Sequence, residues 1–263
     1  MKAFLLSCRS TLLLGIATLL LSSGTAPAQG ANAQGAASGN VLAQMSAAFF
    51  GEQVIQRVQL SGTATWHAGS LVDTGTVNLT ASAAGTSEMR LIFADTGQRT
   101  ETQTGAGLSA DCQWMGADGV PHEVDSGNCW KPMLWFLPAF SVQSSILPSY
   151  LRAVDLGMGT VGSGTNVYRH VQGTLVPTNL PNALMANIAQ QSTSDLGLDP
   201  ASLLPSVLTY QIHPDNGSQV NIGIEIRYSE YRQVNGAMIP YRIQRYVNGA
   251  LQLDIQLNSA QLS

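Results

Sequence analysis

The stretch VNIGIEIRYSEYRQVNGAMIPYRIQRYVNG (Val220–Gly249) decides the fold. Apolar residues alternate with polar ones in VNIGIEIRY and again in MIPYRIQRYV, which is the pattern of strands that bury one face. Asn235-Gly236 lies between the two runs and is the strongest short signal for a hairpin turn. A two-residue turn there sets Tyr228 opposite Ile243, so that the two apolar faces coincide. The stretch therefore predicts an antiparallel hairpin with one buried face.

A second turn follows at Val247–Gly249 and leads into another alternating run. A two-residue turn would set Leu253 opposite Gln244 and would place apolar and polar side chains on the same face. A three-residue loop instead sets Leu253 opposite Ile243 and keeps one apolar face. We therefore expect a three-residue loop, with Gly249 in the left-handed conformation of a bulged hairpin.

The rest of the chain extends the same antiparallel pattern. Helical spacing of apolar residues predicts an amphipathic helix at Asn40–Phe50 and a short helix that starts at Pro181. Prolines interrupt the apolar segment Trp130–Pro148, so we expect short helical pieces that lie on the sheet. Five further stretches have the pattern of strands: 58–66, 71–79, 89–93, 153–157 and 166–176. The predicted fold class is mainly antiparallel β (α+β).

The N-terminus has the features of a secretory signal peptide. Lys2 and Arg9 form a basic region, Thr11–Leu21 forms a short apolar region, and Ala26-Pro27-Ala28 supplies small residues for cleavage. The apolar region is too short for a comfortable membrane span, and no second such run follows. We therefore expect a periplasmic or secreted protein, with cleavage near Ala28 and no membrane span in the mature chain. We expect the chain to consist of a signal peptide at 1–28, a flexible leader at 29–39 and a single domain at 40–263.

Composition and cysteine usage agree with export. The formal net charge of −4 argues against binding to nucleic acid, which requires a basic face. Removal of the signal peptide takes away Cys8 and leaves Cys112 and Cys129, which we expect to pair in an oxidising compartment. Such a disulfide contributes on the order of 3 kcal/mol to stability.

Motifs that would indicate an enzyme or a cofactor are weak. The segment Gly157–Gly162 matches G-x-G-x-x-G, but polar residues and a strand follow it, so a glycine-rich turn is the better interpretation. The sequence lacks G-x-S-x-G, and its four histidines lack metal-ligand spacing. We expect no cofactor, no metal site and no catalytic residue, and a hydrolase stays the least favoured alternative.

Two segments near the C-terminus resemble a known family. The first, LDPASLLPSVLTYQI (Leu198–Ile212), contains D-x-x-x-x-L-P at Asp199–Pro205. The second, Arg227–Gly249, contains Y-x-x-V-x-G-x-x-I-P at Tyr231–Pro240. Together they resemble the end of LolA-like proteins, the relatives of the periplasmic lipoprotein carrier that takes part in outer-membrane lipoprotein sorting. The resemblance implies an open, curved half-barrel sheet, with short helices over a concave face that holds acyl chains or other hydrophobic ligands.

Candidate ligand-binding residues come from the aromatic segment and from the C-terminal strands. The aromatic side chains of the segment either fill the core or form a lid over a cavity. Arg245 lies on the face of Ile243 and Val247, where it either reaches solvent at the sheet edge or contacts an acidic head group at the cavity mouth. Ten residues are candidates for the site: Trp130, Trp135, Phe136, Phe140, Ile224, Ile226, Tyr228, Tyr241, Ile243 and Arg245.

The leading hypothesis is an exported, non-enzymatic protein that binds a hydrophobic small molecule, a lipid or the acyl chain of a lipoprotein. The alternative is a structural or interaction module of the cell envelope whose core is filled by its own side chains. The sequence predicts no particular protein partner.

Overall fold

The structure of the protein is a computed structural model, which describes residues 41–130, 134–143, 147, 149–214 and 220–263. The expected signal peptide and leader lie outside the described residues. So do Asn40 at the start of the first helix and parts of the Trp130–Pro148 segment.

The described residues form one antiparallel sheet of 13 strands. Its strand order is β6-β5-β4-β3-β2-β1-β13-β12-β11-β10-β9-β8-β7, so two meanders are joined where β1 pairs with β13. The first meander contains β1 (Arg57–Ala68), β2 (Leu71–Ser82), β3 (Thr86–Phe93), β4 (Gln98–Thr104), β5 (Asp111–Met115) and β6 (Pro121–Glu123). The second contains β7 (Leu151–Thr160), β8 (Val167–Leu175), β9 (Ser194–Leu198), β10 (Pro205–Ile212), β11 (Ile222–Val234), β12 (Ala237–Val247) and β13 (Ala250–Leu262).

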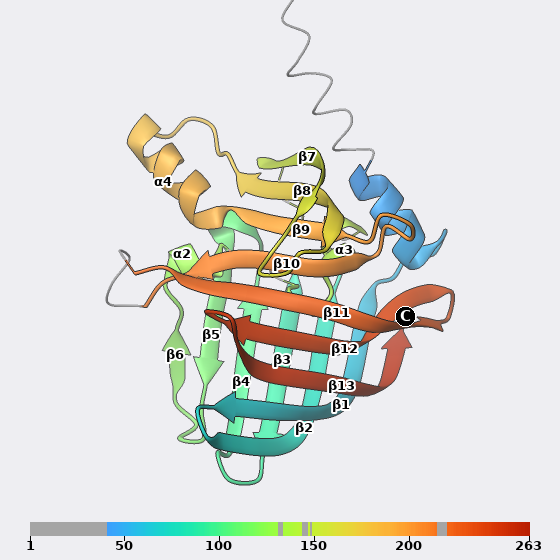
Figure 1. Cartoon of the computed structure of the whole chain (residues 1–263). Coiled ribbons are helices and arrows are strands. Elements are labelled where there is room, and N and C mark those ends of the chain that lie inside the picture. The colour runs from blue at the N-terminus through green and yellow to red at the C-terminus, as the bar shows by residue number, and fades with distance from the viewer. Residues whose placement is uncertain (1–40, 131–133, 144–146, 148, 215–219) are drawn as a thin grey trace, which may run out of the picture.

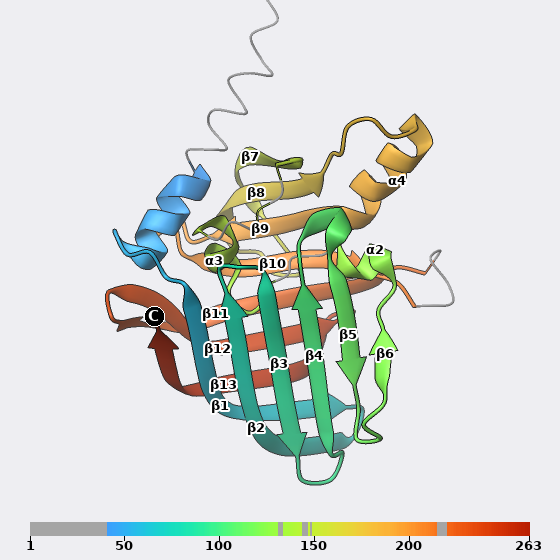
Figure 2. The same ribbon diagram turned by 180° about the vertical axis from the view of Figure 1, so that it is seen from behind.

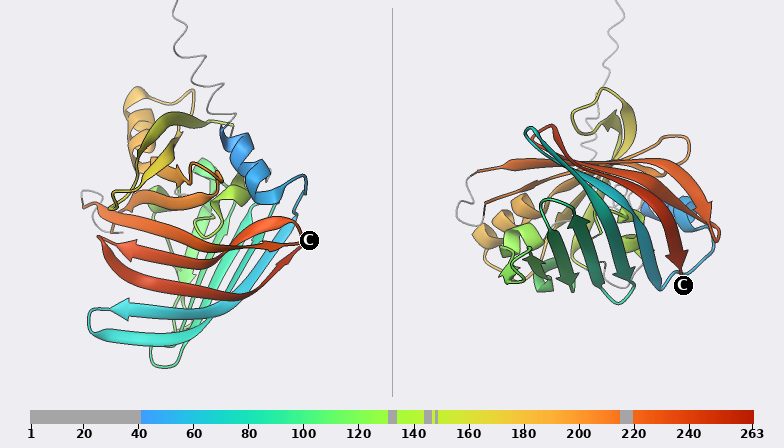
Figure 3. Two further views of the ribbon diagram at one scale, coloured as in Figure 1. Left: turned by 45° about the vertical axis from the view of Figure 1, so that its right-hand side comes forward. Right: turned by 90° about the horizontal axis from the view of Figure 1, so that it is seen from below.

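The sheet is strongly curved and open. Strands β3–β6 run across the back of strands β9–β13, as the front and rear views in Figure 1 and Figure 2 show. In the view from below, the helical residues 41–50 and the short helix α3 lie between the two halves of the sheet (Figure 3). The helices are residues 41–50, η1 (Gly107–Ser109), α2 (Ser126–Cys129), α3 (Pro138–Gln143) and α4 (Asn182–Ser192). This arrangement confirms the predicted half-barrel sheet with short helices over its concave face.

Two glycines allow the strands to approach closely where the sheet bends. A Cβ atom on Gly62 would lie 2.1 Å from the main-chain oxygen of Gln256, and one on Gly75 would lie 1.9 Å from that of Ile92. The pairing of β1 with β13 also shifts between Ser61 and Gly62, which marks a bulge. Bulges and glycines increase the local twist of a sheet, so these positions favour the sharp curvature.

The β11–β12 hairpin has the predicted register. Tyr228 pairs with Ile243, and Asn235 and Gly236 both have positive φ, as a type I′ turn requires. The predicted register of the β12–β13 hairpin is wrong. Asn248 and Gly249 also form a two-residue turn with positive φ at both positions, and Val247 pairs with Ala250.

A bulge on β13 explains this difference. Tyr246 pairs with Leu251 and Arg245 with Leu253, so the extra residue, Gln252, lies in the strand and not in the loop. Ile243 consequently pairs with Ile255 instead of Leu253. The extra residue restores the alternation, so the apolar residues of the two strands still share one face.

That shared face forms the hydrophobic core. Tyr228 packs in it at 5% exposure, while α3 and the helix at 41–50 cover it with Phe140 and Phe50, whose ring centroids are 6.1 Å apart. Within the described part of the aromatic segment, α3 confirms the expectation of short helical pieces. Core residues with no exposed surface include Ile226, Ile239, Ile243, Leu253 and Ile255.

Candidate ligand-binding site

Two neighbouring cavities lie within the curve of the sheet. The larger has a volume of about 590 Å³ and is lined from one side by β3–β5 and from the other by β10–β13. The smaller has a volume of about 150 Å³ and lies among the helix at 41–50, α3 and β7–β10. Gln103 lines both cavities, so they are adjacent at β4. The larger volume falls within the range of about 300 to 1,000 Å³ that is usual for small-molecule sites.

A single row of side chains crosses the concave face beside the larger cavity. Strand pairing sets Trp66 opposite Leu253, Leu253 opposite Arg245, Arg245 opposite Ile226, and Ile226 opposite Leu208. Paired residues on antiparallel strands present their side chains on the same face. Arg245 is therefore the charged member of an otherwise apolar row.

The opposite wall carries polar side chains where apolar ones would be expected. On β4, Arg99 pairs with Leu91 and Glu101 pairs with Met89, and both partners on β3 are buried. Arg99, Glu101 and Gln103 therefore share the concave face and line the larger cavity. Two of the three charged groups of the cavity, Arg99 and Glu101, therefore come from this wall.

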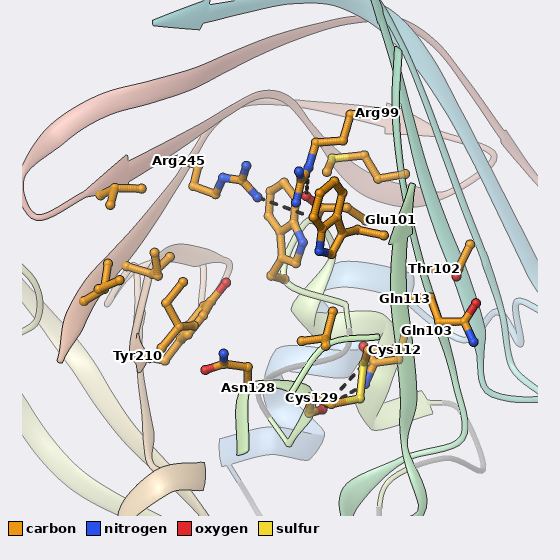
Figure 4. A pocket seen from close by; sticks show the side chains of 18 of the residues that line it. Arg99, Glu101, Thr102, Gln103, Cys112, Gln113, Asn128, Cys129, Tyr210 and Arg245 are labelled. Carbon is orange, nitrogen blue, oxygen red and sulfur yellow. Dashed lines mark hydrogen bonds and ion pairs between the residues drawn. A yellow bond between two sulfur atoms is a disulfide. The ribbon is translucent and has the colours of Figure 1, made fainter. Parts of the chain in front are cut away.

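The charged groups meet across the cavity (Figure 4). Glu101 accepts a hydrogen bond of 2.6 Å from Nε of Arg99, and its second oxygen lies 3.8 Å from Nη1 of Arg245. Burial alone would raise the pKa of Glu101, but attraction by Arg245 and Arg99 outweighs it and holds the pKa below the ordinary 4.5. The carboxylate is therefore ionised at neutral pH, and the three groups together carry one net positive charge.

Three indole rings surround these groups. The guanidinium carbon of Arg245 lies 5.3 Å from the ring centroid of Trp135 and 5.9 Å from that of Trp66. The guanidinium of Arg99 lies 4.6 Å from the ring of Trp114. Such contacts between a cation and an aromatic face are attractive, and more so away from water. Each arginine is thus held by aromatic rings as well as by Glu101.

A disulfide fixes one side of the larger cavity. Cys112 of β5 and Cys129 at the end of α2 are bonded, as the sequence predicts, and both line the cavity. Gln103 donates a hydrogen bond of 3.2 Å to the main-chain oxygen of Cys129. Asn128 exchanges two hydrogen bonds, of 2.6 and 2.8 Å, with the main chain of His213. The short helix α2 is consequently tied to both halves of the sheet.

The smaller cavity has a predominantly apolar lining. Leu42 and Met45 come from the helix at 41–50, Val142 comes from α3, and Trp130 follows α2. The sheet contributes Leu151, Ala153, Val171, Leu175, Leu196 and Leu208. Such a lining accommodates a hydrocarbon group and offers it few hydrogen-bonding partners.

The structure divides the ten candidate residues into three groups. Trp135, Phe136, Ile224 and Arg245 line the larger cavity, and Trp130 lines the smaller one. The other candidates line neither cavity and pack in the core: Phe140, Ile226, Tyr228, Tyr241 and Ile243.

Residues that the sequence does not mark as candidates complete the larger cavity. Arg99 and Glu101 lie in QRTETQT (Gln98–Thr104), which contains no apolar residue and gives no sign of which face is buried. Their inward orientation follows only from pairing with the alternating strand β3. Trp114 and Tyr210 also line the cavity, and burial raises the pKa of the Tyr210 hydroxyl, which stays protonated.

A third hollow, of about 520 Å³, has a polar lining that includes Asp195 and Glu225. Both carboxylates are already paired there. Glu225 accepts hydrogen bonds from the main-chain nitrogen of Ser163 and from Arg227, and Asp195 bonds with His170. We therefore do not assign it a ligand.

The fold of the chain is similar to those of several solved structures. No protein-family model matches the chain, and no curated protein matches it in sequence. A DUF1329 family protein from Desulfovibrio piger matches in structure with a TM-score of 0.55 at 13% identity, over 88% of this chain and 93% of that one. A domain named for outer membrane lipoprotein sorting, from Vibrio parahaemolyticus, matches with a TM-score of 0.53 at 10% identity, over 87% and 93%.

A LolA superfamily protein from Nitrosomonas europaea matches with a TM-score of 0.52 at 10% identity, over 86% of this chain and 93% of that one. The chain has the LolA-like fold. The resemblance to LolA-like proteins that Asp199–Pro205 and Tyr231–Pro240 indicate is thereby confirmed as a likeness of fold. At these identities, the LolA-like fold says nothing by itself about the ligand.

Within residues 41–130, 134–143, 147, 149–214 and 220–263, no three side chains of His, Cys, Asp or Glu gather as ligands for a metal ion. In the same part of the chain, no helix is long and apolar enough to cross a membrane.

Proposed function

We propose that this protein is an exported, non-enzymatic carrier that holds a lipid, an acyl chain or another hydrophobic ligand in the concavity of its LolA-like sheet. The observation that carries the proposal is the pair of adjacent cavities within the curve of the sheet, one of them with a mainly apolar lining. A core filled by its own side chains would leave no such space, since protein interiors are close-packed.

The structural neighbours and the N-terminus support the same reading. One neighbour is named for outer membrane lipoprotein sorting and another for the LolA superfamily. Together with the signal-peptide features of residues 1–28, they favour a periplasmic or secreted location, with cleavage near Ala28. In this proposal residues 40–263 form the single carrier domain.

The test is to purify the protein from the compartment to which it is exported and to analyse its extract by mass spectrometry. We expect a co-purifying lipid or acyl compound. We also expect a neutral fluorescent probe, N-phenyl-1-naphthylamine, to bind and to be displaced by that compound. An extract without lipid, together with no probe binding, would exclude the carrier.

A structural or interaction module of the cell envelope is the second candidate. It is favoured by the packed state of Ile226, Tyr228 and Ile243, which the sequence predicts to face a ligand. It is also favoured by Met158 and Val167, which are more than half exposed on the two strands at one edge of the sheet. A stable protein partner in pull-downs, with no bound lipid, would support this alternative.

A further inference from the structure

Arg245 is unusual for a residue that lines a carrier of purely hydrophobic ligands. It occupies the middle of the apolar row on the concave face, between Leu253 and Ile226, which are both fully buried. Its side chain is 13% exposed. Burial of a charge is costly unless partners compensate for it, so we expect the guanidinium of Arg245 to have such partners or to bind a ligand.

The groups present in the described residues compensate Arg245 only in part. Its Nε is buried and has no hydrogen-bond partner there. Its nearest carboxylate oxygen, on Glu101, lies at 3.8 Å, whereas Arg99 holds the other oxygen of that carboxylate at 2.6 Å. A guanidinium can bind a carboxylate or a phosphate through two parallel N–H groups. Arg245 therefore retains unused capacity to donate hydrogen bonds.

The surroundings of Arg245 favour an anion over a cation. The indoles of Trp66, Trp114 and Trp135, which would attract a cationic ligand, already contact the two arginines. The charged cluster of Arg99, Glu101 and Arg245 has a net charge of +1, although the chain as a whole has a net charge of −4. A local positive site inside an acidic protein attracts a negative group.

We propose that the larger cavity binds the acidic head group of an amphiphile, a carboxylate or a phosphate, through Arg245, while the apolar part of the ligand lies against the indole rings and Phe136. This inference rests on the proposed carrier function and specifies the class of its ligand. Arg245 is the binding residue, and Glu101 is its internal counter-ion, which a bound anion displaces. The adjacent apolar cavity at Gln103 offers space for a longer hydrocarbon chain.

The test compares ligands that share one chain and differ in the head group. Dodecanoate, dodecyl phosphate, dodecanol and dodecyltrimethylammonium compete with N-phenyl-1-naphthylamine for the exported protein at neutral pH. We expect one or both anions to bind about tenfold or more tightly than dodecanol, since a hydrogen bond to a charged group is worth at least that factor. The ranking of carboxylate against phosphate identifies the acidic group. We expect the ammonium compound to bind most weakly.

Three variants separate binding from folding. Arg245→Gln should bring the affinity for the preferred anion to within about threefold of that for dodecanol. Glu101→Gln should strengthen anion binding severalfold, because it removes the competing carboxylate. Both should change dodecanol binding much less than anion binding. Arg242→Gln is the matched control on the same strand, because Arg242 pairs with Asp254 on the outer face, and it should change neither affinity.

The outcomes distinguish this inference from the proposed function. Equal binding of the anions and dodecanol by the unsubstituted protein overturns the head-group site and leaves the carrier intact. Absence of binding by every compound overturns the carrier as well. If Arg245→Gln does not fold, the ranking of head groups and the Glu101→Gln variant decide the question. Equal weakening of all ligands in a folded Arg245→Gln variant shows that Arg245 only holds the sheet together, and also overturns the inference.

Discussion

The hydroxyl of Tyr228, in β11, donates a hydrogen bond to the main-chain oxygen of Trp135, 93 positions earlier in the chain. Tyr228 is 5% exposed, and burial raises the pKa of its hydroxyl well above the ordinary value of 10. The hydroxyl therefore stays protonated, and remains a donor, at neutral pH. This bond fixes the segment that carries Trp135 and Phe136, and so fixes one side of the larger cavity.

Tyr228→Phe tests the importance of this bond. The substitution keeps the ring and removes the donor, which leaves the oxygen of Trp135 without this partner. We expect a loss of about 1 to 3 kcal/mol in the free energy of unfolding, measured by urea denaturation. Tyr246→Phe is the control, because the hydroxyl of Tyr246 makes only a 3.4 Å bond to Gln244. A loss no larger than that of the control would contradict the anchoring role.

The disulfide between Cys112 and Cys129 provides a second prediction. Thiol labelling of the mature, non-reduced protein should modify neither cysteine, even after denaturation. Reduction should lower the free energy of unfolding by on the order of 3 kcal/mol, the value for a loop of this size. The double variant Cys112→Ala/Cys129→Ala should show a similar loss and should not respond to reductant. Labelling of both cysteines without reductant would refute the bond.

The close approach of strands at Gly75 provides a third prediction. The added methyl group of Gly75→Ala would meet the main-chain oxygen of Ile92, so the pairing of β2 with β3 must shift. We expect a loss of about 1 to 3 kcal/mol or a failure to fold. Gly159→Ala is the control, since Gly159 is also in a strand but its added Cβ would lie 3.8 Å from His170. Similar thermal stabilities of the two variants would show that the approach is not required.

The sequence predicts the register of the β11–β12 hairpin but not that of the β12–β13 hairpin, for a physical reason. Asn235-Gly236 leaves one register that buries the apolar faces of both strands, and the structure has it. At Asn248-Gly249 a longer loop and a bulge in the strand both restore the alternation. The turn itself has the two-residue form, and Gln252 supplies the extra residue. Alternation fixes which face is buried, but it does not locate the inserted residue.

The same reasoning explains why the sequence predicts only one wall of the larger cavity. Arg245 stands out because a charge interrupts an alternating apolar face in its own strand. Glu101 and Arg99 have no such contrast, because every residue of β4 is polar. Their proximity to Arg245 depends on the curvature of the whole sheet, which brings β4 opposite β12. Local periodicity carries no information about that long-range contact.

Acid should destabilise the protein partly through Glu101. The arginines beside it hold its pKa below 4.5 in the folded state, so the folded state binds its proton less readily than the unfolded chain does. The stabilisation is therefore complete above about pH 4.5 and is lost as the pH falls through the lower, folded-state pKa. Glu101→Gln should make the urea midpoint less dependent on pH below about 4.5. An unchanged pH dependence in a folded Glu101→Gln variant would contradict this role.

Phe136 and Phe140 distinguish a ligand-contacting aromatic residue from a core residue. Both are almost fully buried, but Phe136 lines the larger cavity, whereas Phe140 packs against Phe50. Replacement by Ala in a packed interior costs about 3 to 5 kcal/mol, so Leu is the better probe for binding.

Phe136→Leu should weaken the binding of dodecanoate and dodecanol alike, because the lost contact is apolar. Phe140→Leu should lower the thermal midpoint and leave both affinities unchanged in the folded protein. If the two variants instead lose stability equally and bind equally well, the aromatic segment is plain core, and the structural module becomes the better account of the protein.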